Sequence, residues 1–184
     1  METELIFIRH GETVWNEEKR YNGVSDLSLS EAGARKIREL KKDNIYPRVD
    51  MLFLSPMKRC METAAIIYPD LQGIVIDEFK EIDFGRLEGK NFEELKSDPE
   101  YMKWVESGGS TPFPGAEDKD AYIDRVLRGY DRMLKLIKEN GQVRKAAVVC
   151  HGGTIMSVMS RNDRDSYYSY MTPNGGVKIC TESL

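Results

Sequence analysis

Short apolar runs alternate along this chain with longer segments whose apolar residues recur at the spacing of one helical face. Five short runs predict β-strands, at 4–8, 51–54, 74–76, 146–150 and 177–180. Four longer segments predict helices, at 30–43, 56–68, 118–139 and 154–161. Because strands alternate with helices, we expect an α/β fold: a three-layer sandwich with a mostly parallel central sheet and helices on both faces.

Sequence signals at the helix ends support these ranges. Ser30 is a predicted N-cap, and Ser55 is another, with Pro56 as the first helical residue of 56–68. Asn140-Gly141 is a typical C-terminal stop for the long helix at 118–139. The apolar residues of that helix fall on one face: Ile123, Val126, Leu127, Tyr130, Met133, Leu134 and Ile137.

Two segments lack a clear period. Residues 11–29 are rich in turn formers, and a loop of that length is often functional. Residues 77–117 combine acidic residues with glycine and proline, and short helices are predicted at 91–97 and 99–107. We expect 77–117 to be a capping insertion over the end of the sheet, inside a single domain spanning residues 1–184, because it is too short for a domain of its own.

Composition excludes several classes of protein. The net charge is −4, from 27 basic and 31 acidic residues, and no basic run predicts a nucleic-acid partner. No apolar run is long enough to predict a membrane span. Three widely spaced cysteines favour reduced thiols and a cytoplasmic protein. With two histidines and no Cys-x-x-Cys pair, we expect no metal site and no cofactor. Oligomeric state has no sequence signature here.

Those two histidines occupy equivalent places. His10 and His151 each follow the last apolar residues of a predicted strand, and each precedes glycine, in Arg9-His10-Gly11 and Cys150-His151-Gly152-Gly153. Parallel strands would bring both histidines to one edge of the sheet, where ligands bind in open α/β folds. Glycine at such a place lets the backbone approach a ligand and present its N–H groups. The pair therefore predicts a binding or catalytic site.

Arg59 is a second anomaly. It lies in the first turn of the predicted helix 56–68, where the helix dipole disfavours a cation. A bound anion would reverse that cost, since helix N-termini bind phosphate and arginine grips it with a planar fork. Arg9, at the end of the first strand, is a second candidate for binding phosphate through its guanidinium group. The two arginines and two histidines together predict a phosphate site.

The chemistry of phosphoryl transfer fits these residue types. A neutral imidazole such as that of His10 can attack phosphorus and form a phosphohistidine, and nearby arginines favour the neutral ring. They also neutralise the charge of the transferring group. The leaving alkoxide needs a proton from a partly buried carboxylic acid. The pattern alone offers three such acids and does not choose among them: Glu81, Asp83 and Glu88.

These motifs resemble those of the histidine phosphatase superfamily, which includes the cofactor-dependent phosphoglycerate mutases. The resemblance covers nearly the whole chain in the right order. It is carried by Arg9-His10-Gly11-Glu12-Thr13, Trp15-Asn16, Arg20, Gly23, Asp26, Leu29-Ser30, Gly33, Ser55-Pro56, Arg59, Glu62-Thr63-Ala64, Glu81, Gly85, Glu88-Gly89, Pro114-Gly115 and His151-Gly152-Gly153.

The resemblance implies roles for individual residues. His10 would be the phosphorylated histidine and Glu81 the proton donor. By the same resemblance, the phosphate pocket would be formed by the side chains of Arg9, Arg59, His151 and Asn16. Backbone groups near Gly23 and Gly152 would assist them. The implied activity is that of a metal-independent histidine acid-type phosphatase, a phosphoric monoester hydrolase whose partner is a small phosphorylated metabolite.

Departures from the family pattern bear on the substrate. Gly115-Ala116-Glu117-Asp118 stands where many phosphatase members have Gly-Gly-Glu-Ser, and the long insertion and tail of true mutases are absent. A mutase must hold its phosphoenzyme away from water. We therefore expect a phosphatase rather than a phosphoglycerate mutase-type enzyme. The segment 81–89 most resembles α-ribazole phosphatases, while sugar phosphates and phosphoglycerate remain alternative substrates.

Two alternatives to a histidine phosphatase make different demands on the sequence. A cysteine phosphatase needs an arginine six positions after a strand-end cysteine, but Met156 and Ile66 occupy those positions after Cys150 and Cys60. A catalytically silent phosphoester-binding protein is the alternative from another class. Such a protein is expected to have lost a core residue of the motif, and none is lost here.

Overall fold

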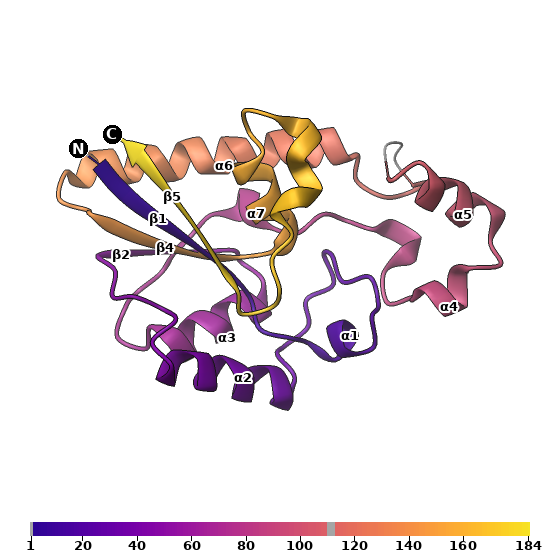
Figure 1. The fold of residues 1–184 in the computed structure, drawn as a ribbon, viewed down its shortest axis with the longest axis horizontal. Coiled ribbons are helices and arrows are strands. Elements are labelled where there is room, and N and C mark those ends of the chain that lie inside the picture. The colour runs from indigo at the N-terminus through magenta and orange to yellow at the C-terminus, as the bar shows by residue number, and fades with distance from the viewer. Residues whose placement is uncertain (1, 110–112) are drawn as a thin grey trace.

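The strand that leads into His10, β1 (Glu2–Arg9), lies inside a five-stranded sheet with the order β3-β2-β4-β1-β5. The computed structural model describes residues 2–109 and 113–184. The other strands are β2 (Met51–Leu54), β3 (Ile74–Val75), β4 (Lys145–Cys150) and β5 (Val177–Ser183). Figure 1 shows helices above and below this sheet, which confirms the predicted three-layer α/β sandwich.

The sheet is mostly parallel, as predicted. β1, β2, β3 and β4 are parallel, with Arg9 of β1 paired with Cys150 of β4. β5 is longer than its predicted range and runs antiparallel to β1. The direction follows from where β5 begins: the N–H of Gly175 donates to the carbonyls of Arg9 and His10, so the chain enters β5 at the carboxyl end of β1 and runs back along it.

Side chains of each inner strand alternate between the two helical layers. Leu5 and Phe7 face the layer formed by α6 (Lys119–Asn140) and α7 (Gly152–Met159). Ile6 and Ile8 face the layer formed by α2 (Glu31–Lys42) and α3 (Lys58–Ile67). Both faces are buried, which explains the continuous apolar runs of these strands. No helix in the described part of the chain is long and apolar enough to cross a membrane.

Helix ends largely agree with the sequence signals. The Ser30 side chain accepts from the N–H of Gly33 and caps α2, and Gly141 ends α6 in the left-handed region at φ 71°. The prediction that Ser55 caps the next helix is wrong. Met57 is the N-cap of α3 and makes no side-chain capping bond, because the Ser55 hydroxyl is hydrogen-bonded to His151 instead.

The segment 77–117 lies beyond the carboxyl ends of β1 and β4 (Figure 1). It contains two short 3₁₀ helices, η1 (Asp77–Phe79) and η2 (Gly85–Leu87), followed by α4 (Phe92–Leu95) and α5 (Pro99–Glu106). A small separate cluster of Leu87, Leu95, Tyr101 and Phe113 packs inside it. Residues 110–112 of the predicted insertion lie outside the described residues. We infer that this segment is a cap belonging to the single domain.

Two further elements have no counterpart in the sequence prediction. α1 (Val14–Glu17) is a single turn inside the predicted loop 11–29, closed by a capping box between Thr13 and Asn16. η3 (Arg164–Tyr170) follows α7 and leads to β5. Both are too short for their apolar residues to show a helical period.

Candidate active site

His10 and His151 meet at the carboxyl edge of the sheet, as their strand positions predict. The N–H of His10 donates to the carbonyl of Cys150 at 3.0 Å, which continues the β1–β4 ladder by one residue. The two imidazole ring centroids are 5.1 Å apart and the rings meet edge to face, at 66°. His10 is 3% exposed and His151 is fully buried. The two histidines therefore form one buried pair.

The hydrogen bond of His10 fixes its tautomer. Nδ1 lies 2.7 Å from the carbonyl oxygen of Gly11, and a carbonyl can only accept. Nδ1 therefore carries the proton, and the lone pair of the neutral ring is on Nε2. The backbone around it is held from both sides: Thr63 Oγ1 accepts from the N–H of Gly11, and Asn174 Nδ2 donates to the carbonyl of His10. His10 thus presents a fixed nucleophilic nitrogen.

His151 is held in a different way. Its Nε2 lies 2.7 Å from Ser55 Oγ, and that oxygen accepts from the N–H of Met57 at 3.4 Å. The Ser55 hydroxyl keeps one O–H that can donate to Nε2, and with that direction the ring proton of His151 lies on Nδ1. Cys60 Sγ lies 3.5 Å from the same Nε2, and burial raises the pKa of the Cys60 thiol to about 12, so it remains a thiol.

Both imidazoles are kept neutral by their surroundings. Burial lowers the pKa of His10 well below its usual value, and the positive charge of Arg59 lowers it further. Burial and the charge of Arg59 have the same effect on the pKa of His151, and the neighbouring His10 adds to it. A neutral ring has the lone pair that nucleophilic attack needs, and it keeps one N–H that can donate to an anion.

Arg59 is fully buried in the first turn of α3, where burial adds to the cost that the helix dipole already imposes on a cation. Its two terminal nitrogens donate to the carbonyls of Gly23 and Ser25, at 2.7 and 2.8 Å. Its Nε is buried and has no hydrogen-bond partner among the described residues. A buried, unpartnered donor on a charged group is costly unless a ligand accepts from it.

Arg9 has the same character. One terminal nitrogen donates to the carbonyl of Thr172 at 2.6 Å, while Nε is buried without a partner in the described chain. A Cβ at Gly152 would lie in ordinary contact with Arg9 Cζ, at 3.4 Å, so the guanidinium packs against the first residue of α7. The structure thus brings two arginines with unpartnered buried nitrogens close to two neutral histidines, the residue types from which the sequence analysis predicts a phosphate site.

The structure separates the three candidate acids. The Glu88 carboxylate accepts from the N–H groups of Gly23, Val24, Ser25 and Phe84, so it serves as an anchor for the loop. Asp83 accepts from the N–H of Gly85 at 2.7 Å within its own turn. Glu81 is 9% exposed and accepts from the N–H of Gly153 at the start of α7, next to His151. Position favours Glu81 as the acid of this site.

The three predicted binding residues differ in what they offer. Asn16 Oδ1 accepts from Thr13 N–H, which caps α1 near the pocket. Gly152 is the first residue of α7, where backbone N–H groups face outward from the helix. Gly23 offers no free backbone group, since its N–H donates to Glu88 and its carbonyl accepts from Arg59. Gly23 shapes the pocket; a Cβ there would lie 2.0 Å from the carbonyl oxygen of Ile82.

Among the described residues, no group of three or more histidine, cysteine, aspartate or glutamate side chains could hold a metal ion. The model of the histidine phosphatase superfamily (branch 1) matches residues 5–179. The chain belongs to the histidine phosphatase superfamily. The family prediction made from the sequence motifs is therefore confirmed, and the match covers nearly the whole chain.

Individual relatives show what this superfamily member is similar to. Phosphoserine phosphatase 1 of Hydrogenobacter thermophilus is 32% identical over 152 residues, which cover 80% of this chain and 70% of that protein. A mutant phosphoserine phosphatase from Entamoeba histolytica, solved with phosphoserine, is 28% identical with a TM-score of 0.78, covering 96% of this chain and 89% of that one.

A further solved structure supports the fold alone. A putative α-ribazole-5′-phosphate phosphatase from Escherichia coli K-12 has a TM-score of 0.82 at 22% identity, covering 99% of this chain and 91% of that one. The predicted fold class is confirmed by this likeness and by the observed sheet.

Sequence reasoning missed three contributors to the site. Ser55 was assigned to a helix cap, and Thr172 supplies only a backbone carbonyl to Arg9, which no side-chain pattern reveals. Tyr122 donates to Glu81 at 2.6 Å from the buried face of α6. The sequence feature that could have indicated Tyr122 is a hydroxyl group close to the apolar face of the predicted helix at 118–139.

Proposed function

We propose that this histidine phosphatase hydrolyses phosphomonoesters of small metabolites through a phosphohistidine formed on His10. The observation that carries the proposal is the hydrogen bond from His10 Nδ1 to the Gly11 carbonyl, which leaves the Nε2 lone pair of a neutral ring in the anion pocket. Family membership supports phosphatase chemistry, and the geometry supports the assignment of the nucleophile.

In the first step, His10 Nε2 attacks the phosphorus atom as the bond from phosphorus to the ester oxygen breaks. The leaving alkoxide takes a proton from the carboxyl group of Glu81. The products are a phosphohistidine, a free alcohol and a Glu81 carboxylate. This step uses a neutral imidazole and a protonated acid, the protonation states that general acid catalysis with a nitrogen nucleophile requires.

The charge of the transferring group is met by residues that surround His10. Arg9 and Arg59 direct their unpartnered Nε atoms to the phosphoryl oxygens, and His151 donates its Nδ1–H. The N–H of Gly152 and the Asn16 side chain complete the pocket. Preorganised donors of this kind commonly contribute the largest share of catalysis in phosphoryl transfer.

In the second step, water attacks the phosphohistidine. The Glu81 carboxylate takes a proton from this water as the nitrogen–phosphorus bond breaks. Inorganic phosphate leaves, His10 returns to its neutral form, and Glu81 is again protonated. The same residue acts as acid and then as base, so each cycle restores the starting state.

Small phosphorylated metabolites are the substrate class that we favour. Two of the proteins similar to this chain are phosphoserine phosphatases, and a third, similar in fold, is a putative α-ribazole-5′-phosphate phosphatase. α-Ribazole phosphate, phosphoserine, sugar phosphates and 3-phosphoglycerate are therefore the compounds to compare by kcat/KM. Phosphoglycerate mutase activity would show itself in the same assay as an isomerised product with no release of phosphate.

The covalent intermediate is tested by partitioning. In the presence of glycerol, the phosphoenzyme passes its phosphoryl group either to water or to glycerol. The ratio of glycerol phosphate to inorganic phosphate must be the same for every substrate, because all substrates form the same intermediate. A ratio that changes with the leaving group contradicts the proposal.

We also infer that the reaction needs no metal ion. Two arginines, one N–H of a histidine and backbone N–H groups supply the positive charge that a metal would otherwise provide. Turnover is expected to be unchanged after dialysis against EDTA, at saturating and limiting substrate alike. Loss of activity that added Mg²⁺ or Zn²⁺ restores would overturn this inference.

A cytoplasmic location is the third part of the proposal. Cys60 and Cys150 are buried free thiols, and Cys180 is a partly buried one, as in proteins of a reducing compartment. Fractionation of source cells, followed by immunoblotting, should recover the protein with cytoplasmic markers, and recovery with an extracytoplasmic marker would contradict this.

A further inference from the structure

Tyr122 is a buried polar side chain that the mechanism above does not use. It projects from α6 and is fully buried, and its phenol O–H donates to Glu81 Oε1 at 2.6 Å. Phenylalanine would fill the same apolar space without a hydroxyl to satisfy. Burial, together with the neighbouring Glu81 charge, raises the pKa of Tyr122 well above its usual value, so the phenol keeps its proton and remains a donor.

The two oxygens of Glu81 have unequal partners. Oε1 accepts from the Tyr122 O–H at 2.6 Å and from the N–H of Ile82 at 3.0 Å. Oε2 accepts from the N–H of Gly153 at 3.3 Å, a longer bond. A proton on Oε1 would face two donors at short distance. The proton of the acid form is therefore carried on Oε2.

We propose that Tyr122 is a positioning residue that fixes Glu81 so that Oε2 carries and delivers the proton to the leaving group. The inference rests on the proposed function, in which Glu81 is the acid. Tyr122 acts through Glu81 and touches neither the phosphoryl group nor the leaving oxygen in this account.

Neighbouring residues hold Tyr122 and Glu81 in contact. Arg125 lies about one turn along α6, with its Cζ 5.0 Å from the centroid of the Tyr122 ring. Arg125 also donates to the carbonyls of Glu78 and Lys80 and pairs with Glu117. One helix thus holds the backbone that leads to Glu81 through Arg125, and its carboxyl group through Tyr122.

Gly153 supports the same arrangement from α7. A Cβ at this position would lie 2.4 Å from Glu81 Oε1 and 2.5 Å from the Tyr122 hydroxyl oxygen. Any larger residue would separate the phenol from the carboxyl group. The helix α7 therefore leaves space for the pair and contributes the N–H that contacts Oε2.

A pH–rate profile separates positioning from packing. Glu81 must be protonated in the first step, so with an alkyl phosphate the alkaline limb of kcat/KM reports loss of that proton. In general, a phenol O–H that donates to a carboxyl oxygen interacts more strongly with the ionised form than with the neutral acid. Tyr122→Phe removes the donor and is expected to move this limb up by roughly one pH unit. Site-specific replacement of Tyr122 by 3,5-difluorotyrosine strengthens the donor and is expected to move the limb down.

Other ionisable groups act on Glu81 and stay unchanged in both variants. They come from β1, β4, α3, α6 and η3, and they are Arg9, Cys150, Cys60, Arg125 and Tyr167. A shift that differs in sign between the two variants is therefore assigned to the phenol of Tyr122.

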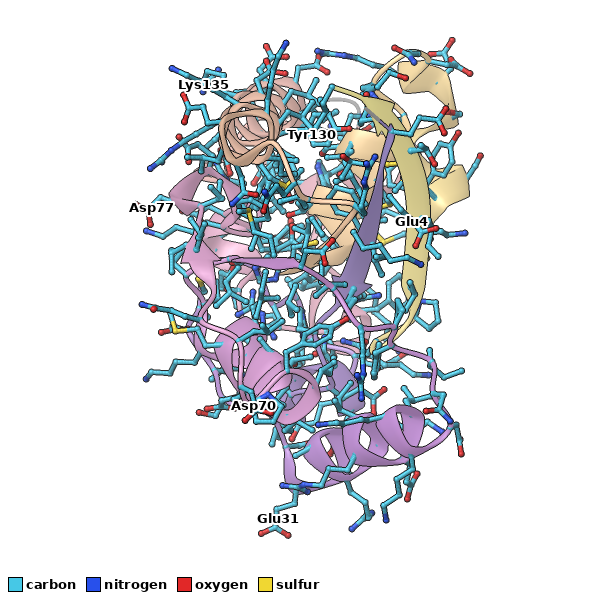
Figure 2. The ribbon with its side chains drawn as sticks, turned by 90° about the vertical axis from the view of Figure 1, so that its left-hand side faces the viewer. Glu4, Glu31, Asp70, Asp77, Tyr130 and Lys135 are labelled. Atoms are coloured by element: carbon cyan, nitrogen blue, oxygen red, sulfur yellow. The ribbon has the colours of Figure 1, made fainter. Side chains whose placement is uncertain are left out.

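Tyr130→Phe is the matched control. Tyr130 lies on the same helix, is 3% exposed, and donates to Glu182 Oε1 at 2.6 Å, the same length as the Tyr122 bond. Figure 2 shows Tyr130 on the inward side of α6 and Lys135 on the outward side. Tyr130→Phe is expected to lower Tm by an amount similar to Tyr122→Phe and to leave the pH profile unchanged.

The outcomes separate this proposal from the proposed function. Opposite shifts in the two Tyr122 variants, with the limb absent in Glu81→Gln, support it. If Glu81→Gln removes the limb and neither Tyr122 variant moves it, the role of Tyr122 is overturned while Glu81 remains the acid. If the limb persists in Glu81→Gln, the acid assignment itself fails. If Tyr122→Phe does not fold, the difluorotyrosine variant decides: a downward shift supports the proposal and an unmoved limb overturns it.

Discussion

The ends of β1 and β4 carry the same residue in the same setting and use it differently. His10 and His151 follow neighbouring parallel strands, are both buried, and both have a pKa held far below the usual value by burial and by Arg59. They differ in the hydrogen-bond partners of their rings. His10 Nδ1 donates to a carbonyl of its own loop, whereas His151 Nε2 contacts the Ser55 hydroxyl.

In the proposed mechanism, these hydrogen-bond partners assign the two roles. A carbonyl partner on Nδ1 leaves the distal nitrogen of His10 as a free lone pair, which suits a nucleophile. A hydroxyl that donates to Nε2 leaves Nδ1 of His151 as the N–H donor, which suits stabilisation of negative charge. Burial and nearby positive charge make both rings neutral, and the hydrogen-bond partner then decides which nitrogen faces the substrate.

The largest expected effect comes from removing each histidine in turn. His10→Ala removes the nucleophile, so kcat should fall about 10⁴-fold or more, in the range seen when a covalent catalyst is deleted. His151→Ala removes one donor to the transferring group, and a loss of about 10²- to 10³-fold is expected. Steady-state kinetics with an alkyl phosphate measures both.

The roles of the two histidines are tested by whether His10→Ala loses more activity than His151→Ala. Equal losses would mean that the two strand ends act as one unit, and a larger loss in His151→Ala would exchange the roles. Circular dichroism and Tm of both variants check that each one folds, since each replacement removes a buried ring.

The apolar runs predict the placement of these histidines, and the resemblance to the superfamily implies different roles for them, but the hydrogen bonds that distinguish the two rings are not visible in the sequence. Apolar runs identify strands, and a mostly parallel sheet brings strand ends together, so the pairing of His10 with His151 follows from local pattern and topology. The Ser55–His151 bond joins residues 96 positions apart, and the Tyr122–Glu81 bond joins residues 41 positions apart. Such contacts depend on side-chain packing in the finished fold, and a pattern of neighbours along the chain does not contain them.

Helix prediction shows the same difference between features that a local sequence pattern reveals and features that it does not. The period of α6 was visible because seven apolar residues repeat along 22 positions, whereas α1 has four residues and η3 has seven. Arg59 was predicted at an anion site because its charge conflicts with the dipole of α3. The same reasoning misplaced Ser55, since a serine before a proline is a good cap unless its hydroxyl is needed elsewhere.

A smaller effect is expected from Ser55→Ala. Loss of the hydroxyl frees the His151 ring to adopt the other tautomer, so kcat/KM should fall roughly 10-fold, as for other partners that orient a functional histidine. Ser160→Ala is the matched control, because Ser160 is 1% exposed and its hydroxyl donates to the Met156 carbonyl at 2.7 Å, away from the pocket. Equal activity in Ser55→Ala and Ser160→Ala would mean that Ser55 does not set the tautomer.

The smallest effect is on stability. Both histidines stay neutral in the folded protein while the unfolded chain protonates them near pH 6.5, so the unfolded state binds more protons below that pH. The free energy of unfolding should therefore fall as pH decreases, by about 1 kcal/mol per histidine between pH 6.5 and 5.5.

Urea unfolding at half-unit intervals of pH measures this loss. His10→Asn and His151→Asn should each reduce the decrease by about 1 kcal/mol relative to the wild type, because each removes one titrating ring. Carboxylate titrations are common to all three proteins and cancel in the comparison. A decrease as steep as that of the wild type in either variant would show that the ring concerned is not held neutral.

The central claim, that His10 and not His151 becomes phosphorylated, is tested most directly by rapid quenching. The enzyme is mixed with a ³²P-labelled phosphoester, quenched in alkali during turnover, digested and mapped by mass spectrometry. The account predicts an acid-labile, alkali-stable phosphohistidine on the peptide containing His10, absent from His10→Ala and retained in His151→Ala. Label on His151, or label that survives in His10→Ala, would contradict it.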